Sequence, residues 1–199
     1  MPPPTVEKYL DAFKWFTGLL TGAGVAVPAY TYFTSYSPPL LESASLLTAA
    51  ISVAAIVFAY YFKPRLRAGE DLGHKLLQIA RRALIVGLAL FVIYLVLVKL
   101  CTVPAQLTPG SPVQRYQVGF WTFDWSLNKD GRDLKAARPG VTPYELMDYG
   151  VAFSDDGPSK LWELWTIYAA GLTMVVVFLL SFVLWVFGWS LLAKRRAMG

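Results

Sequence analysis

Small and hydroxylated residues recur at helical spacing in two apolar stretches near the N-terminus. The hydroxylated members are Thr17, Thr21, Thr31 and Ser35 in the first stretch, where Gly24 and Pro28 continue the spacing, and Ser45, Thr48 and Ser52 in the second. Steps of three and four residues place each set on one helix face. Hydroxyls in an apolar medium need partners, which a neighbouring helix or water in a pore would supply. The stripes therefore predict either a helix-packing seam, which Gly18 and Gly22 would reinforce, or a weakly polar pore lining.

Basic residues gather in the segment 63–82, and they are the side chains best suited to binding an anion. They are Lys63, Arg65, Arg67, Lys75, Arg81 and Arg82. Between the two clusters, Leu72, Leu76, Ile79 and Ala83 share one side of a predicted amphipathic helix. One interpretation is orientation of the chain together with contact to anionic lipid. The other is a site for a nucleotide, an oligonucleotide or an acidic partner protein, assembled when several subunits bring their loops together.

Composition excludes most other chemistry. The chain of 199 residues is 56% hydrophobic and 16% charged, which is too apolar for an ordinary soluble domain. Cys101 is the one cysteine and cannot form an intramolecular disulfide, and the single histidine, His74, argues against a metal site. With no nucleophile paired with a base, we expect no enzyme, no metal and no cofactor.

Four stretches are long and apolar enough to cross a bilayer as helices, namely 15–36, 40–62, 83–101 and 164–193. The first is the weakest, because it is rich in Gly and Thr and carries Pro28. The predicted fold is therefore an all-α integral membrane protein with four transmembrane helices and a small mixed extracytoplasmic cap. The remaining segments are an interfacial segment at 1–14, the basic loop at 63–82, the cap at 102–163 and a basic tail at 194–199.

Positive charge orients the predicted spans. If they alternate, one side holds eleven basic and four acidic residues. The basic set is Lys8, Lys14, Lys63, Arg65, Arg67, Lys75, Arg81, Arg82, Lys194, Arg195 and Arg196. Because loops rich in Lys and Arg stay in the cytoplasm, this side is predicted to be cytoplasmic. The expected location is the inner (plasma) membrane, crossed several times, with both termini in the cytoplasm.

The segment 102–163 reads as a small cap rather than an independent domain. Three prolines at its start rule out a continuous helix, and the aromatic and β-branched residues of 114–128 predict a strand or hairpin that ends in a turn at 129–131. Thr142 and Glu145 have the spacing of a capping box that opens a short helix. Ser159 is predicted to cap the last span. The N-terminal segment is expected to be either a short amphipathic helix capped by Thr5 or a frayed tail.

An aromatic run in the cap has two interpretations. Trp121, Phe123 and Trp125 are expected to form either part of the cap core or a contact with the outer leaflet of the bilayer.

A unit of this size can enclose a pore or build a platform only in several copies, so we expect a homo-oligomer in the lipid bilayer. The leading hypothesis is a membrane channel or membrane-perturbing effector gated through its basic cytoplasmic segment. The alternative is a non-conducting scaffold or sensor subunit that recruits a cytoplasmic partner.

The layout resembles the small four-span membrane proteins of bacterial antiphage defence. The resemblance rests on the number of spans, the basic loop and the outer cap across the whole chain, and no motif carries it. It implies either an ion-conducting effector gated by a nucleotide or oligonucleotide, or a sensor of the cell envelope.

Overall fold

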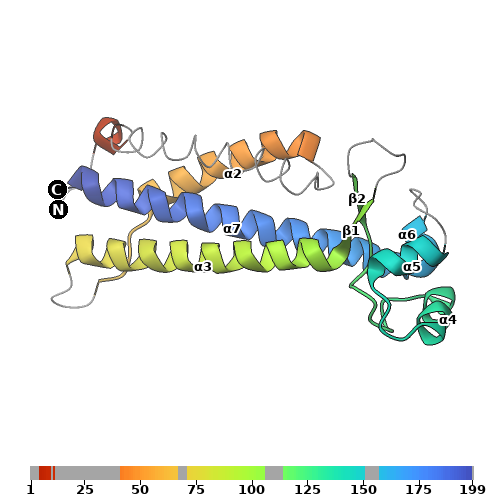
Figure 1. The fold of residues 1–199 in the computed structure, drawn as a ribbon. Helices are drawn as coiled ribbons and strands as arrows, with labels where there is room; N and C mark the ends of the chain where they lie inside the picture. The colour runs from red at the N-terminus through yellow and green to blue at the C-terminus, as the bar shows by residue number, and fades with distance from the viewer. Residues whose placement is uncertain are drawn as a thin grey trace. The chain divides into compact units, whose positions relative to one another are not determined.

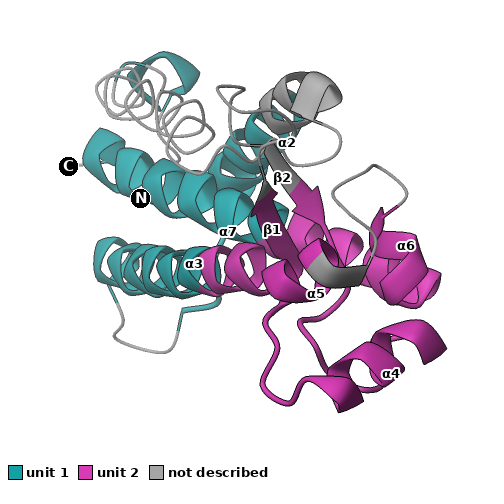
Figure 2. Cartoon of the chain, turned by 45° about the vertical axis from the view of Figure 1, so that its right-hand side comes forward, with its two compact units in different colours: residues 1–29, 40–92, 178–199 teal, residues 30–39, 93–177 magenta. Residues whose placement is uncertain are grey.

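The computed structural model describes residues 5–9, 11, 41–66, 71–105, 114–150 and 157–198 of the chain. Most of the described residues are helical (Figure 1). The chain divides into two compact units (Figure 2). Unit 1 comprises Met1–Ala29, Leu40–Val92 and Phe178–Gly199, and unit 2 comprises Tyr30–Pro39 and Ile93–Val177.

Two helices are long and apolar enough to cross a membrane. They are α3, Leu72–Cys101, and α7, Leu164–Met198, with 30 and 35 residues. At 1.5 Å per residue they extend over about 45 and about 52 Å, against about 30 Å for a hydrocarbon core. Within their most apolar windows only 22% and 28% of the residues are buried, whereas the core helix of a soluble protein is mostly buried. These helices contain the predicted spans 83–101 and 164–193.

The other two predicted spans are described only in part. Helix α2, Leu41–Tyr61, coincides with most of the predicted span 40–62, and its side chains are described from Ala50 onward. The predicted span 15–36 lies outside the described residues. The structure therefore supports two spanning helices, and the count of four stays a prediction.

Helix α3 is continuous with the predicted amphipathic segment of the basic loop. Its start is fixed by the carboxylate of Asp71, which accepts a hydrogen bond of 2.9 Å from the backbone N–H of His74. The segment 72–82 contains no proline that would break the helix before the apolar run begins. The polar and apolar parts therefore form a single helix. Likewise, α7 continues beyond Ala193 through the basic residues to Met198.

A core of small and aliphatic side chains joins α2, α3 and α7 within unit 1. Ala59 of α2, Leu76 and Ala80 of α3 and Leu191 of α7 are each completely buried. Leu76 belongs to the predicted apolar side of the first turns of α3, and Leu72 and Ile79 of the same side pack against this core. That side therefore packs against the protein.

Glycines bring α3 and α7 into close contact. A Cβ atom at Gly87 would lie 2.4 Å from the Cδ1 atom of Trp185, and one at Gly188 would lie 2.8 Å from the Cγ atom of Leu84. Ser181 adds a hydrogen bond of 2.9 Å from its hydroxyl to the backbone carbonyl of Gly87. We refer to Gly87, Gly188, Ser181, Leu84 and Trp185 as the glycine seam. It combines close backbone approach with a satisfied hydroxyl, as packing within a bilayer requires.

Unit 2 holds the predicted mixed cap. Strands β1, Thr102–Ala105, and β2, Gln114–Gln117, pair antiparallel, with Val103 opposite Tyr116. Three short helices follow: α4, Lys129–Ala137; α5, Pro143–Gly150; and α6, Gly157–Leu161. Their buried core is made of Val103, Val118, Leu127, Val141, Leu146, Met147, Leu161 and Trp162.

Of two local predictions in the cap, the capping box and the turn at 129–131, only the first agrees with the structure. The capping box is confirmed, since the Glu145 carboxylate accepts hydrogen bonds from the backbone N–H of Thr142 at 2.8 Å and from its hydroxyl at 2.9 Å. The predicted turn at 129–131 is wrong, because Asn128 caps α4 there by accepting a hydrogen bond of 2.9 Å from the N–H of Gly131. Gly131 serves packing instead, since a Cβ atom would lie 2.2 Å from the carbonyl oxygen of Leu161.

Two further cap predictions need correction. The predicted strand over 114–128 ends at Gln117, and the following residues form turns held by side-chain hydrogen bonds. Ser159 does not cap α7, because it lies inside α6 and the long helix begins five residues later at Leu164.

Candidate anion-binding surface

The predicted basic residues that the structure describes lie just after α2 and on the first turns of α3, at one end of unit 1. Lys63 and Arg65 follow the last turn of α2, whereas Lys75, Arg81 and Arg82 lie on the first turns of α3. All except Lys75, which is half-buried, are exposed. Arg67 lies outside the described residues.

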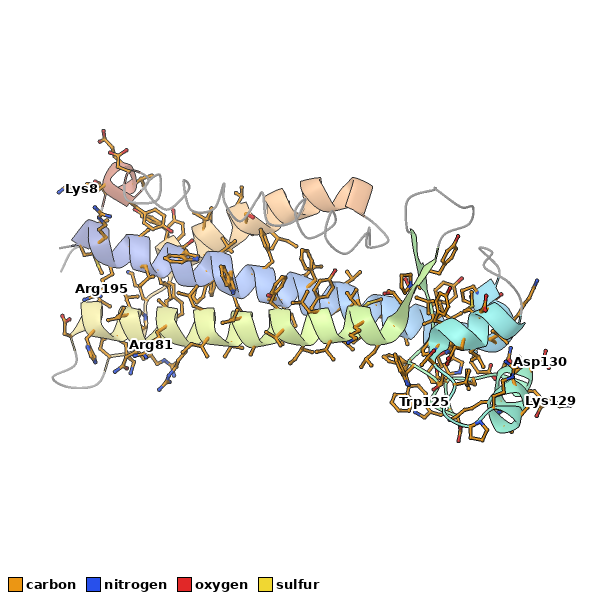
Figure 3. All side chains as sticks on the ribbon, viewed as in Figure 1. Lys8, Arg81, Trp125, Lys129, Asp130 and Arg195 are labelled. Carbon is orange, nitrogen blue, oxygen red and sulfur yellow. The ribbon has the colours of Figure 1, made fainter. Side chains whose placement is uncertain are left out.

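Helix α7 and the N-terminal segment add further cations to this end. Figure 3 shows Lys8, Arg81 and Arg195 at the same end of unit 1, with Lys8 and Arg81 on opposite sides of the view. Arg195 and Arg196 are exposed in the last turn of α7. We define the basic surface as Lys63, Arg65, Lys75, Arg81, Arg82, Arg195 and Arg196.

Lys194 ties two of the helices together beneath this surface. Its side chain is 6% exposed, and its ammonium group donates to the backbone carbonyls of Ala59 at 3.3 Å, Tyr60 at 2.5 Å and Phe62 at 2.8 Å. The last carbonyls of a helix have no partner within it and carry the negative end of its dipole. A cation from α7 therefore caps the C-terminus of α2, and the hydrogen bonds offset the cost of burying the charge.

The N-terminal segment packs onto the same helices. Residues 6–9 are helical, and the N–H of Tyr9 donates to the carbonyl of Thr5 at 3.0 Å. Tyr9 is buried against Ala193 and Trp189, its ring lies 5.1 Å from that of Tyr60, and its hydroxyl donates to the Ile56 carbonyl at 3.3 Å. The start of the chain thus contributes to the core below the basic surface.

An arginine-rich surface of this kind suits phosphate groups. Guanidinium groups keep their charge at all physiological pH values and bind phosphate through paired hydrogen bonds. Asp71 is the acidic residue closest in sequence to Lys75 that the structure describes, and its carboxylate is occupied by the N-terminus of α3. Six of the seven side chains of the basic surface are exposed among the described residues, a geometry that suits a lipid headgroup or a larger soluble anion.

The hydroxylated stripes are mostly beyond what the structure describes. Thr17, Thr21 and Thr31 lie outside the described residues, and the side chains of Ser45 and Thr48 are not described. Ser52 is half-buried on α2. Both interpretations of these stripes therefore stay predictions.

Two features of unit 1 were missed from the sequence. The charge pattern assigns Lys194 to the predicted basic tail at 194–199, although a lysine at the end of an apolar run can also fold back onto another helix end. The GxxxG spacing of Gly18 and Gly22 predicts close packing there, and Gly87 and Gly188 lack that spacing. An isolated glycine within an apolar helix weakens the helix and so usually has a packing reason, which is the signal that would have identified them.

No protein-family model, no curated protein and no solved structure matches the chain.

Proposed function

We propose that the chain is a multi-pass membrane protein of the scaffold or sensor class, with the basic surface on its cytoplasmic face. Support comes from α3 and α7, whose apolar windows are less than one third buried within the protein. Water would be an unfavourable neighbour for that much apolar surface, whereas lipid chains are a favourable one. The excess of Lys and Arg at one end supports the inner membrane with both termini in the cytoplasm.

The observation that carries the proposal is the shared core beneath the basic surface. Ala59, Leu76 and Leu191 connect α2, α3 and α7 in one buried cluster, and each lies within four residues along the chain of a cation of the basic surface, namely Lys63, Lys75 and Arg195. An anion that binds cations of two of these segments would therefore also change how the third packs in the shared core. We propose that the basic surface receives a phosphate-bearing signal, from a lipid headgroup or from a nucleotide or oligonucleotide, and that the spans carry the response.

The serine and threonine hydroxyl groups of α7 are used in hydrogen bonds within the protein, as in helices that pack and do not line a pore. The hydroxyl of Ser181 donates to Gly87, and those of Thr173 and Ser190 donate to carbonyls of their own helix at 2.7 Å. A lining for ions needs polar groups that remain available to water. This arrangement favours the scaffold or sensor over the homo-oligomeric channel for the described part of the membrane region.

A channel would depend on the stripes of the first two predicted spans. Conductance in planar bilayers, and its change in Thr21→Leu and Ser52→Leu, distinguishes the two functions. A change in conductance in these variants would replace the scaffold by the channel. The resemblance to antiphage membrane proteins is compatible with either function and stays a prediction.

The test of the basic surface is a binding measurement on the full chain in nanodiscs. ATP and a short oligoadenylate are added to nanodiscs of uncharged lipid, and thermal stability is compared with that in nanodiscs containing phosphatidylglycerol. Arg81→Glu combined with Arg82→Glu reverses two exposed charges of the surface. Lys129→Glu combined with Arg132→Glu makes the same change on exposed positions of α4 and is the matched control.

Three outcomes are distinguishable. Nucleotide binding that the α3 variant loses and the α4 variant keeps identifies a soluble ligand. Stabilisation by phosphatidylglycerol alone, lost in the same variant, identifies a lipid contact. If neither anion acts, or if both variants behave alike, the basic surface is not a phosphate site, and co-purification of an acidic cytoplasmic protein becomes the measurement to make.

A further inference from the structure

An aromatic cluster lies on the outside of unit 2, and neither the core nor the proposed function accounts for it. The rings of Phe123 and Trp125 stack with their centroids 6.0 Å apart and an interplanar angle of 8°. The ring centroids of Trp125 and Trp165 are 6.1 Å apart. These side chains are 49%, 52% and 59% exposed. Three large aromatic rings thus lie against one another on the surface of unit 2.

The segment 119–126, here called the aromatic loop, is held rigidly in this arrangement. The hydroxyl of Ser126 accepts a hydrogen bond of 2.8 Å from the N–H of Phe120 and donates to the hydroxyl of Thr166 at 3.2 Å. Trp162 donates from its ring nitrogen to the carbonyl of Trp121 at 2.7 Å. Trp121 adopts a positive φ of 48°, which costs free energy for a bulky residue. The backbone geometry therefore presents the rings outward.

The carboxylate of the aromatic loop, that of Asp124, is bound by α4. Asp124, between the two stacked residues, pairs with Lys135 of α4 at 2.6 Å. The same ammonium group donates to the carbonyl of Thr122 at 2.7 Å. Phe123 and Trp125 therefore share one side of the loop, and the carboxylate between them is engaged by α4.

The cluster continues into an exposed apolar stripe on α7. Trp165, Tyr168, Leu172 and Val176 follow steps of three and four residues and are 44% to 68% exposed. They occupy one face of the first turns of a helix that is long and apolar enough to cross a membrane. The partner of the stripe under the proposed function is lipid, and the cluster is contiguous with it through the contact of Trp125 with Trp165.

We infer that Phe123, Trp125 and Trp165 form an interfacial anchor that inserts the aromatic loop into the headgroup region of the outer leaflet. This inference rests on the proposed membrane insertion. Trp side chains favour this region, because it accommodates both the apolar ring and the polar N–H edge, and Phe123 adds apolar ring area beside Trp125. A flat, rigid cluster at the end of a spanning helix fixes the depth of that helix and the orientation of the cap.

The experiment uses nitroxide labels on single introduced cysteines in the full chain, reconstituted in phosphatidylcholine vesicles. Phe123→Cys reports on the cluster, Leu172→Cys on the α7 stripe, and Asp130→Cys on an exposed position of α4. The natural Cys101 is buried, so the unsubstituted chain serves as the background for labelling. Collision rates with oxygen, which concentrates in lipid, and with a water-soluble nickel chelate give the environment of each label.

We expect the ratio of oxygen to nickel collisions to be several-fold higher at 123 and at 172 than at 130. A label at 123 that resembles the one at 130, while the label at 172 is in lipid, overturns the anchor and leaves membrane insertion standing. A label at 123 shielded from both reagents overturns it in favour of a contact between copies. If the label at 172 is also in water, the proposed insertion of α7 itself is wrong.

Discussion

The glycine seam of unit 1 and the aromatic loop of unit 2 are both held in place by tertiary contacts, but the contacts are of different kinds. In the seam, two regular helices satisfy their own backbone groups, so only close contact at Gly87 and Gly188 and one hydroxyl bond are needed. In the loop, irregular backbone depends on side chains such as Ser126 and Trp162 for its hydrogen bonds. The stability of the seam therefore depends on side-chain volume, whereas that of the loop depends on individual hydrogen-bonding atoms.

The largest effect is expected where the core of unit 2 and the aromatic loop meet. Trp162 is completely buried, and its ring nitrogen holds the carbonyl of Trp121. Trp162→Ala should lower the free energy of unfolding by about 3–5 kcal/mol. The thermal unfolding midpoint in detergent, followed by circular dichroism, measures this loss. Trp125→Ala, which removes an exposed ring, is the matched control and should cost about 1 kcal/mol at most. Equal losses would contradict the assigned core.

Added volume should be costly in the seam. Gly87→Val places side-chain atoms where Trp185 and the backbone of Ser181 already lie, so we expect a loss of about 3 kcal/mol. Ala89→Val makes a similar change on an exposed face of α3 and should be nearly neutral. Unfolding midpoints of the two variants in the same detergent decide the matter. A tolerated valine at 87 would show that the helices are not in close contact there.

Removing the tie at Lys194 should have an intermediate effect. Lys194→Met keeps the unbranched apolar part of the side chain but leaves the carbonyls of Ala59, Tyr60 and Phe62 without their donor. We expect a loss of about 2 kcal/mol, together with faster hydrogen exchange in the last turn of α2. Arg195→Met removes an exposed neighbouring charge and should leave that exchange unchanged. Similar exchange in both variants would argue that another group caps α2.

The smallest effect is expected at the capping box of α5. Hydrogen bonds from the backbone N–H and hydroxyl of Thr142 lower the pKa of Glu145, which is exposed. The stabilisation is therefore present above the ordinary carboxyl pKa and is lost as pH falls through the lowered value. The protection of the amides at the start of α5, measured as the exchange rate relative to that of an unstructured peptide at the same pH, should fall as pH falls in the unsubstituted chain, and this dependence should disappear in Glu145→Gln. Asp148→Asn, exposed on the same helix, is the control that should retain it.

Some of this structure follows from local patterns in the sequence. Uninterrupted apolar runs predict α3 and α7, and the Thr142–Glu145 spacing predicts the start of α5, because both signals act within a few residues. The turn expected at Gly131 failed for the opposite reason. That glycine is required by a carbonyl of Leu161, which is 30 positions away in the sequence, and no local pattern records such a contact.

The candidate site shows the same division. Its charges can be read directly from the sequence, since Lys and Arg stand out between apolar runs. The role of Lys194 could not be, because its acceptors are carbonyl groups, which every residue possesses. The two interpretations of Phe123 and Trp125 likewise differ only in which way the rings point, and that direction is set by Ser126, Thr166 and Trp162.

The tie made by Lys194 also has a consequence for the order in which the protein is made. Ribosomes synthesise α2 long before α7, and the bonded groups are separated by 132 to 135 positions. Until α7 emerges, the carbonyls at the end of α2 must find other hydrogen-bond donors, such as water. This contact therefore forms late in folding, because a chain whose synthesis has reached only the cap still lacks the lysine that caps α2.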